Sequence, residues 1–190
     1  MTDIQDEIEL MRRTANGDPA AFRALADAHL TKIMNFAYRL LHNRTDAEDV
    51  AQETFLRLWK DASRFEPRAR VTTWLHRIAH NLCVDRMRGR REQPSETLDE
   101  ERAAPGEPVD RILDRHEVAG EVDRALAELP ERQRAAITLV HYQELGNIEA
   151  AEVLDIGVEA LESLLARGRR SLREKLANLK WQEVQREARG

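Results

Sequence analysis

Two stretches of this sequence concentrate arginine and could bind a polyanion. In the first, residues 64–91, eight arginines face only Glu66 and Asp85, a local charge of +6, and the aromatic residues Phe65 and Trp74 lie among them. Cationic side chains beside aromatic ones suit single-stranded nucleic acid, because cations follow the backbone while flat side chains stack on unpaired bases. The alternative is that Trp74 belongs to the hydrophobic core and the arginines are simply solvated.

The second basic stretch, residues 165–175, holds five basic residues against Glu174. It lies on a predicted helix that follows a shorter helix and a turn at residues 155–157. Two helices joined by a short turn containing glycine form the helix-turn-helix signature, whose second helix enters the major groove of DNA. A solvated basic helix face is the alternative. The predicted DNA-facing residues are Ser163, Arg167, Arg169, Arg170 and Arg173.

The helix pair also predicts its own packing. Asn147 is placed to cap the start of the first helix. The positions predicted to face inward are Ile148, Ala151, Leu154, Leu161, Leu165, Gly168, Leu172 and Leu176.

The whole chain of 190 residues carries a formal charge of −5, which by itself would not indicate a nucleic-acid partner. The charge is unevenly distributed, because residues 1–63 sum to −3 and residues 92–117 to −6. Ala, Leu, Glu and Arg dominate while aromatic residues make up only 5%, which favours helices over strands. The single cysteine, Cys83, excludes an intramolecular disulfide. With no apolar run near the roughly 18 residues of a membrane span, we expect a cytoplasmic protein without membrane insertion.

The hydrophobic spacing predicts an all-α fold of two small helical domains. Residues 1–91 form an N-terminal helical bundle, residues 92–116 a flexible acidic linker rich in proline, and residues 117–190 the helix-turn-helix domain. The predicted helices cover residues 4–16, 19–41 with Asp18 as N-cap, 46 onward, about 72–88, a segment ending before 130, 131–142, 147–154 and 158–179. The helix 19–41 has one predicted apolar face, made of Phe22, Leu25, Ala26, Leu30, Ile33, Phe36, Ala37, Leu40 and Leu41. The helix from 46 onward has a predicted apolar stripe, made of Ala47, Val50, Ala51, Thr54, Phe55 and Leu58.

Other chemistry has little support in the sequence. His76, His80 and Cys83 are spaced to lie on one side of a helix and could present three metal ligands. No fourth ligand is near them, and polar residues at these positions also suit DNA, so we predict no metal site. Glycine-rich phosphate loops and nucleophile motifs are absent, so we predict no catalytic residue, no enzyme activity and no cofactor.

Three blocks of the sequence resemble the extracytoplasmic-function group of bacterial RNA polymerase sigma factors. They are DAEDVAQETFLRLW at Asp46–Trp59, WLHRIAHNLCVDRMRGRR at Trp74–Arg91 and ALAELPERQRAAITLVHYQEL at Ala125–Leu145, in this order around a variable linker. The resemblance covers residues 10–91 and 117–177. It implies a protein that directs core RNA polymerase to specific promoters and assists melting of the −10 element, through binding energy and without covalent catalysis.

The resemblance also implies partners and contact residues. The acidic helix of the family docks on the clamp helices of the polymerase β′ subunit, and the β subunit is a further expected contact. An acidic helix start, favoured by the helix dipole, is the alternative explanation of these carboxylates. The implied polymerase-binding residues are Asp46, Glu48, Asp49, Gln52 and Glu53.

Promoter DNA is the second implied partner. The block that starts at Trp74 engages the −10 element in the family, the loop 64–71 captures a flipped base there, and the helix-turn-helix binds the −35 element. Asp85 could instead orient an arginine rather than touch DNA. The implied −10 residues are Arg77, His80, Asn81, Asp85, Arg88 and Arg91.

The sequence departs from the family in the second DNA-binding helix. Glu162 and Leu164 stand where family members often carry cations, and the stretch 144–151 is only loosely similar to the family. Carboxylates are repelled by phosphates, although glutamate can accept a hydrogen bond from cytosine N4. We therefore expect the −35 contacts to shift toward the arginines that begin at Arg167.

The resemblance implies an anti-sigma factor as a further partner, since members of this group are commonly held inactive that way. Two other functions remain open. A sigma mimic that only captures an anti-sigma factor is motivated by Glu162 and Leu164, but it would be expected to lose the basic residues of the first domain. A conventional helix-turn-helix regulator would leave the first 91 residues unexplained. The basic residues kept in the first domain are Arg77, Arg86, Arg88, Arg90 and Arg91.

Overall fold

The structure is a computed structural model that describes residues 4–67, 70–92 and 116–187. All regular elements in these ranges are helices, which confirms the all-α prediction. The N-terminal lobe consists of α1 (Ile4–Ala15), α2 (Pro19–Leu41), α3 (Arg44–Asp61), a 3₁₀ turn (Ala62–Arg64) and α4 (Val71–Glu92). The C-terminal lobe consists of α5 (His116–Ala127), α6 (Glu131–Ile137), a π-helical turn (Thr138–Tyr142), α7 (Asn147–Leu154) and α8 (Val158–Glu187).

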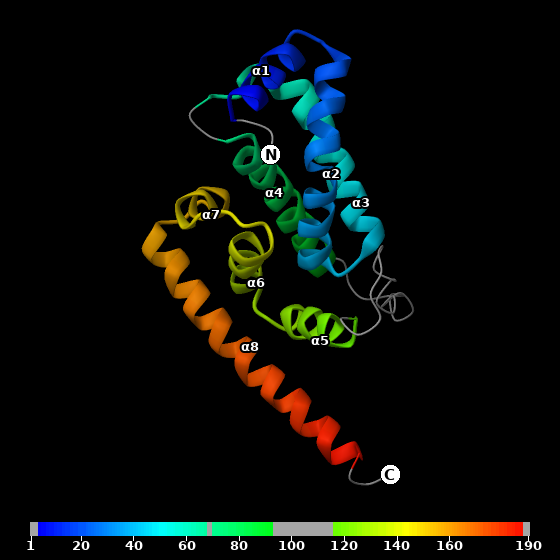
Figure 1. Ribbon diagram of the computed structural model, residues 1–190, viewed down its shortest axis with the longest axis vertical. Helices are drawn as coiled ribbons and strands as arrows, with labels where there is room; N and C mark the ends of the chain where they lie inside the picture. Colours follow the sequence, from blue (N-terminus) through cyan, green and yellow to red (C-terminus); the bar gives the residue numbers. More distant parts are fainter. Residues whose placement is uncertain (1–3, 68–69, 93–115, 188–190) are drawn as a thin grey trace.

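The predicted linker lies almost entirely outside the described residues, because positions 93–115 are not among them. In the described part of the chain, no helix is both long enough and apolar enough to cross a membrane. Figure 1 shows α1–α4 gathered in one bundle, with α8 running along the outer side of the C-terminal lobe.

Local capping explains where the helices of the N-terminal lobe begin. The Asp18 carboxylate accepts hydrogen bonds from the N–H groups of Ala20 at 2.9 Å and Ala21 at 3.3 Å, as predicted for the start of α2. The predicted start of α3 at Asp46 is wrong. The Asn43 side chain accepts from the Asp46 N–H at 2.9 Å, so the helix begins two residues earlier and Asp46 lies in its first turn.

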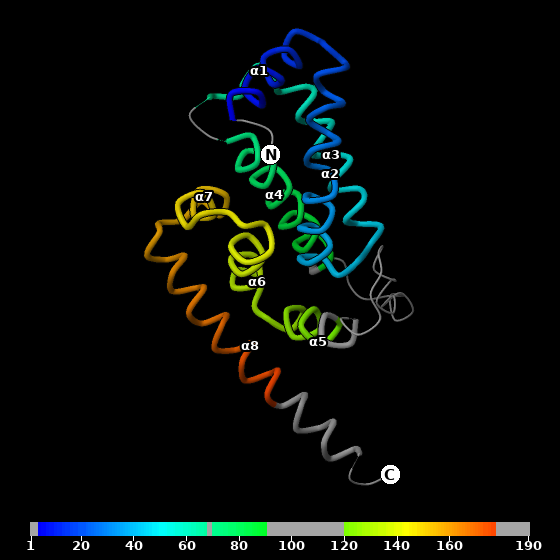
Figure 2. Tube along the Cα trace, viewed as in Figure 1, coloured from blue at the N-terminus to red at the C-terminus, as the bar shows by residue number. Residues whose placement is uncertain are grey.

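The predicted apolar stripe of α3 is buried in full against α2 and α4. Helix α2 also buries its own side chains, among them Phe36 and Ile33, and Figure 2 shows α2 and α3 running side by side. For α2, the prediction that Leu30 lies on the buried face is wrong, because this side chain is 41% exposed. In the part of the chain that the structure describes, no helix covers this position, and the spacing of apolar residues along α2 does not reveal that.

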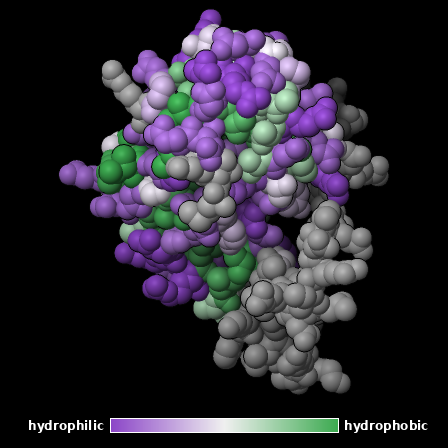
Figure 3. All heavy atoms as spheres, turned by 45° about the horizontal axis from the view of Figure 1, so that its top comes forward, coloured by the Kyte–Doolittle hydropathy of each residue, from purple (hydrophilic) through white to green (hydrophobic). Residues whose placement is uncertain are grey.

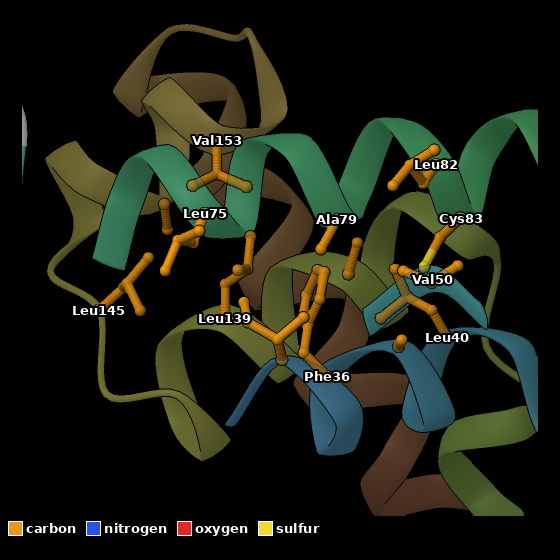
Figure 4. Packing of buried hydrophobic residues seen from close by; sticks show 14 of the residues in the cluster. Phe36, Leu40, Val50, Leu75, Ala79, Leu82, Cys83, Leu139, Leu145 and Val153 are labelled. Atoms are coloured by element: carbon orange, nitrogen blue, oxygen red, sulfur yellow. The ribbon is translucent and has the colours of Figure 1, made fainter. Parts of the chain in front are cut away.

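The two lobes are docked on each other along α4. Helix α7 packs against α4, and α5, α6 and the π-helical turn contact α2. In Figure 4, Leu75 and Ala79 of α4 face the C-terminal side chains Leu139, Leu145 and Val153. These residues belong to one continuous hydrophobic cluster that spans both lobes.

Polar contacts accompany this apolar interface. The imidazole Nε2 of His76 lies 3.4 Å from the side-chain oxygen of Gln143. The Arg39 guanidinium stacks 4.2 Å from the centre of the Tyr142 ring and lies 3.6 Å from the Asp123 carboxylate. A cation over an aromatic ring gains about 0.5–2 kcal/mol depending on its desolvation, so this contact adds to the apolar packing between the lobes.

Several histidines of the docked lobes are held neutral. Burial lowers the pKa of His42 to about 4, and the neighbouring charges of Arg134 and Arg39 act in the same direction. A buried imidazole resists protonation because the charged form loses its hydration. Burial is also the largest cause of the lowered pKa values of His29, His76 and His80.

Acidification is therefore expected to destabilise the fold. A histidine whose pKa is lower in the folded than in the unfolded chain contributes stability that is fully present above pH 6.5 and is lost as the pH falls toward about 4. The free energy of unfolding should fall between about pH 6.5 and about pH 4 in urea titrations.

The variant His42→Asn provides the matched comparison. Asparagine tolerates the left-handed backbone at this position, where φ is 51°, and it does not titrate. Its free energy of unfolding should therefore fall less than that of the wild type over the same pH interval. Equal losses in the two proteins would show that His42 does not carry the predicted effect.

Candidate nucleic-acid and polymerase interfaces

The outer side of α4 carries a strip of exposed polar residues. Arg77, Asn81, Asp85 and Arg88 follow one another at intervals of four, four and three positions, and all four are exposed. The opposite side of α4 is buried in the core between the lobes. Packing therefore fixes how α4 is rotated, and the strip presents hydrogen-bonding and cationic groups to solvent, as contact with DNA requires. The Arg91 side chain lies outside the described side chains.

His80, the sixth predicted −10 residue, is half-buried beside this strip. Burial lowers its pKa, so near pH 7 its imidazole is neutral. Any contact that it makes with DNA would therefore be a hydrogen bond rather than an ion pair with phosphate. The loop 64–71, predicted to hold a flipped base, lies partly outside the described residues, at positions 68–69.

The structure gives the neighbouring metal-ligand candidates other roles. The Nδ1 atom of His76 is hydrogen-bonded to the carbonyl oxygen of Thr72 at 2.8 Å, and its Nε2 atom lies 3.4 Å from the side-chain oxygen of Gln143. Burial raises the pKa of the Cys83 thiol to about 12, so the thiolate that metals prefer is disfavoured. Within the described residues, no three such side chains come together as a metal site.

The predicted polymerase-binding residues lie along α3, with differing exposure. Glu48, Asp49 and Gln52 are exposed, whereas Asp46 and Glu53 are half-buried. Glu53 accepts a hydrogen bond from Arg57 at 3.0 Å and Glu48 one from Arg44 at 2.9 Å, both within the same helix.

Two of these carboxylates pair with α4. Arg86 lies 3.4 Å from the Asp49 carboxylate and 3.8 Å from that of Asp46, and Arg90 contacts the other Asp46 oxygen. The acidic face of α3 and the basic end of α4 are thus joined by ion pairs. This coupling was not predicted, because the partners are about forty positions apart in the sequence.

Hydrophobic residues also reach the surface, as the patches in Figure 3 illustrate for one face. An apolar groove of about 350 Å³ lies between α2 and α3. Its rim includes Leu56, which is 45% exposed, and the predicted polymerase-binding residues Glu48 and Gln52. The full lining is Phe22, Ala26, Leu30, Met34, Glu48, Ala51, Gln52, Phe55 and Leu56.

Sequence reasoning missed the apolar part of this surface. It placed Leu30 in the core and did not single out Leu56. The sequence does hold a sign of it, because Leu56 is apolar although it lies outside the predicted buried stripe of α3. An exposed leucine beside an apolar groove indicates a contact surface when polar residues surround it.

The helix-turn-helix is formed by α7 and α8. Asp155 adopts a left-handed conformation with φ 52° at the turn, and Ala151 and Leu154 are buried as predicted. In α8, Leu161 and Leu165 are also buried as predicted. The DNA-facing side chains predicted for α8 are all exposed: Ser163, Arg167, Arg169, Arg170 and Arg173.

Two predictions for α7 are wrong. Ile148 is 67% exposed rather than buried, because α7 turns Ala150 and Val153 toward its neighbours instead. Asn147 is the first residue of the helix and not its cap. The N-cap is Gly146, whose N–H donates to the Glu149 carboxylate at 2.9 Å.

The family models and the relatives that the chain resembles all belong to the same protein family. Residues 25–93 match the model for Sigma-70 region 2, and residues 119–172 match that for Sigma-70, region 4. The chain is 34% identical over 182 residues to the ECF RNA polymerase sigma factor SigW of Bacillus subtilis, with 89% of this chain and 96% of the relative covered. It is 33% identical over 178 residues to SigM of Mycobacterium tuberculosis strain H37Rv, with 92% and 87% covered.

Solved structures agree with this comparison. CnrH, in complex with the cytosolic domain of CnrY, is similar with a TM-score of 0.70 and 27% identity over 90% of this chain and 97% of that one. The sigma factor RpoE of Bartonella quintana, in complex with the anti-sigma factor NepR, has a TM-score of 0.68 and 24% identity over 82% of this chain and 96% of that one. At this identity, the similarity to RpoE shows only that the two proteins share a fold.

The left-handed residue in the turn gives a test of how the helix-turn-helix is held. Asp155→Val should lower the free energy of unfolding by about 1–2 kcal/mol relative to Asp155→Gly, because a β-branched side chain is strained at positive φ and glycine is not. Urea denaturation of both variants measures the difference. Equal stability of the two variants would mean that the turn does not require this backbone conformation.

Proposed function

Because the chain belongs to the extracytoplasmic-function group of RNA polymerase sigma factors, we propose that it binds core RNA polymerase and directs it to specific promoters. The observation that carries the proposal is the pairing, on one small lobe, of an apolar groove edged by Gln52 with an exposed polar strip on α4. The protein acts by binding and strand separation, so it is not an enzyme. Its site of action is the cytoplasm, where polymerase and promoter DNA are found.

The polymerase contact uses the groove together with the acidic face of α3. Leu56 and Leu30 offer apolar area, while Glu48, Asp49 and Gln52 supply charge and hydrogen-bond acceptors around it. Apolar side chains bordered by carboxylates suit an amphipathic helix with basic flanks. In this proposal the helix is supplied by the β′ clamp, and residues 1–91 are the core-binding and −10-recognition domain.

Promoter contact is divided between the lobes. The strip on α4 engages the −10 element, with Asn81 able to contact base edges and Arg77 and Arg88 able to pair with phosphates. The exposed arginines of α8 hold the −35 element, within a domain of residues 117–190. The linker of residues 92–116 joins the two, and the polymerase β subunit is a further contact.

The docked lobes must separate for this function. The −35 and −10 elements are named by their positions, which are about 25 base pairs apart. This distance corresponds to about 85 Å of B-DNA. The segment 93–115 can reach at most about 80 Å when extended. This reach, added to the size of the lobes, lets the protein span both promoter elements once the lobes have separated. In the separated form, Leu75 of α4 and Val153 of α7 no longer share one core.

An anti-sigma factor is part of the proposal. A partner that stabilised the docked lobes would prevent binding at both promoter elements together. The alternative of a sigma mimic is disfavoured because Arg77 and Arg88 remain exposed on the strip. A conventional helix-turn-helix regulator would have no use for the groove between α2 and α3.

Transcription with purified core polymerase tests the function. The wild-type protein should direct run-off transcription from genomic promoter fragments. Leu56→Asp should lower the affinity for core polymerase about tenfold or more, because it places a charge where apolar area is to be buried. Fluorescence anisotropy with labelled protein measures this affinity.

Ile4→Asp is the matched control. Ile4 is 47% exposed, much as Leu56 is, but it lies on α1 and outside the groove. Its affinity for core polymerase should change less than about twofold. The proposal would be overturned by wild-type protein that directs no transcription, and the groove assignment by equal effects of the two substitutions.

Separation of the lobes can be followed directly. Dyes attached to cysteines introduced at Ala24 of α2 and Ala177 of α8, both exposed, should lose energy transfer when the holoenzyme forms. The native Cys83 is buried and its pKa is raised to about 12, so it should not react. Unchanged transfer in a transcriptionally active holoenzyme would contradict an opening.

A further inference from the structure

One part of the interface between the lobes holds a buried cation. Most of the interface is apolar, with Leu75 of α4 facing Leu139 and Val153 of the C-terminal lobe (Figure 4). Arg134 of α6 lies in the same interface, and its side chain is only 8% exposed. Its Nη2 atom lies 4.0 Å from the Sδ atom of Met87 on α4, so the N-terminal lobe covers the guanidinium.

The guanidinium of Arg134 is incompletely hydrogen-bonded in this position. Its Nη1 donates to the carbonyl oxygen of Ala127, the last residue of α5, at 2.8 Å. Its Nε is buried and has no hydrogen-bond partner among the described residues. Glu131, three positions earlier on α6, favours the charge electrostatically, but burial is the larger effect and lowers the pKa of Arg134. Arginine stays protonated in proteins, so the docked form buries a cation beside a thioether that solvates it poorly.

The charge of Arg134 also acts on the N-terminal lobe. It contributes to the lowered pKa of His42, at the end of α2. The Nε2 atom of His42 is buried and, like Nε of Arg134, has no hydrogen-bond partner among the described residues. Buried polar atoms of this kind cost free energy, and separation of the lobes recovers it by returning the atoms to water.

We propose that Arg134 sets the balance between the docked and the separated lobes. The apolar contacts hold the lobes together, and the buried guanidinium opposes them, because it regains its hydration when α4 moves away. Docking is therefore weaker than the apolar contacts alone would make it, so a partner needs less binding energy to open the lobes. The inference rests on the proposed function for the use of the separated form, whereas the balance itself is a property of the free chain.

Thiol modification of the free protein measures this balance. Val153 is 1% exposed and lies between the lobes, so a thiol introduced by Val153→Cys should react when the lobes separate. In that background, Arg134→Met should slow the modification about fivefold or more, because methionine occupies much of the same space without a charge. Mass spectrometry of the modified peptides distinguishes the introduced thiol from that of Cys83.

Arg132→Met is the matched control. Arg132 lies on the same helix and carries the same charge, but its side chain is exposed. Its replacement removes one cation from the lobe without changing what the interface buries. The rate of modification should therefore change by less than about twofold. Equal slowing by the two substitutions would overturn the inference, because net charge rather than burial would then be responsible.

A purely structural role of Arg134, as the group that caps the end of α5, predicts the opposite result. Arg134→Met would then speed the modification and lower the free energy of unfolding, and this outcome would overturn the inference. If that variant does not fold, Arg134→Gln and Arg134→Lys give the answer, because both keep an N–H donor and only lysine keeps the charge. Modification should be slower in the glutamine variant, and equal rates in the two would count against the proposal.

Binding of core polymerase separates this inference from the proposed function. If polymerase binds the separated form, Arg134→Met should weaken its binding by the factor by which the modification slows. Wild-type protein that does not bind polymerase would overturn the proposed function, while the rates measured on the free chain would still decide the role of Arg134. Slower modification with unchanged polymerase affinity would contradict the use of the separated form.

Discussion

The packing of α4 between the two lobes is the constraint on which the other features depend. One side of this helix lies in the core, where Leu75 and Ala79 meet side chains from both lobes. Only the remaining side is free to bind DNA, so the strip of Arg77, Asn81 and Asp85 is defined by what is buried behind it. A substitution that repacks the interface would rotate the strip as well. Core packing and the proposed promoter contact therefore depend on the same helix.

Electrostatics links this helix to the polymerase face. Arg86 bridges Asp46 and Asp49 of α3 at 3.8 and 3.4 Å. Partly exposed ion pairs of this kind contribute about 0–1 kcal/mol each, so they orient the helices more than they stabilise the fold. Their position matters more than their strength, because the carboxylates belong to the surface proposed to bind polymerase. Binding there would change the partners of Arg86, which lies next to the strip on α4 that is proposed to contact DNA.

Much of this arrangement could be predicted from sequence where the signal is local. The stripe of α3, the Asp18 cap and the turn at residues 155–157 each follow from spacing or side-chain chemistry within a few residues. Prediction failed where the deciding neighbour is distant. Ile148 is exposed because α7 faces α4 of the other lobe, and Leu30 is exposed because none of the described helices covers it. The groove was missed for the same reason, since apolar periodicity does not show which apolar residues stay uncovered.

In the docked form, neither proposed DNA-binding surface is covered by the other lobe. Docking would restrict function by holding the two surfaces close together. The strip on α4 and the predicted DNA-facing side chains of α8 are both exposed in the docked form, so each could contact DNA alone. Under the proposed function, the distance between the two promoter elements requires the lobes to separate, and docking holds them together. Opening would expose Leu139, Leu145 and Val153, at a cost of about 25 cal/mol for each Å² of apolar surface. DNA, a polyanion, cannot cover such a surface. A protein surface such as that of core polymerase can, so under the proposed function polymerase binding opens the lobes and DNA binding follows.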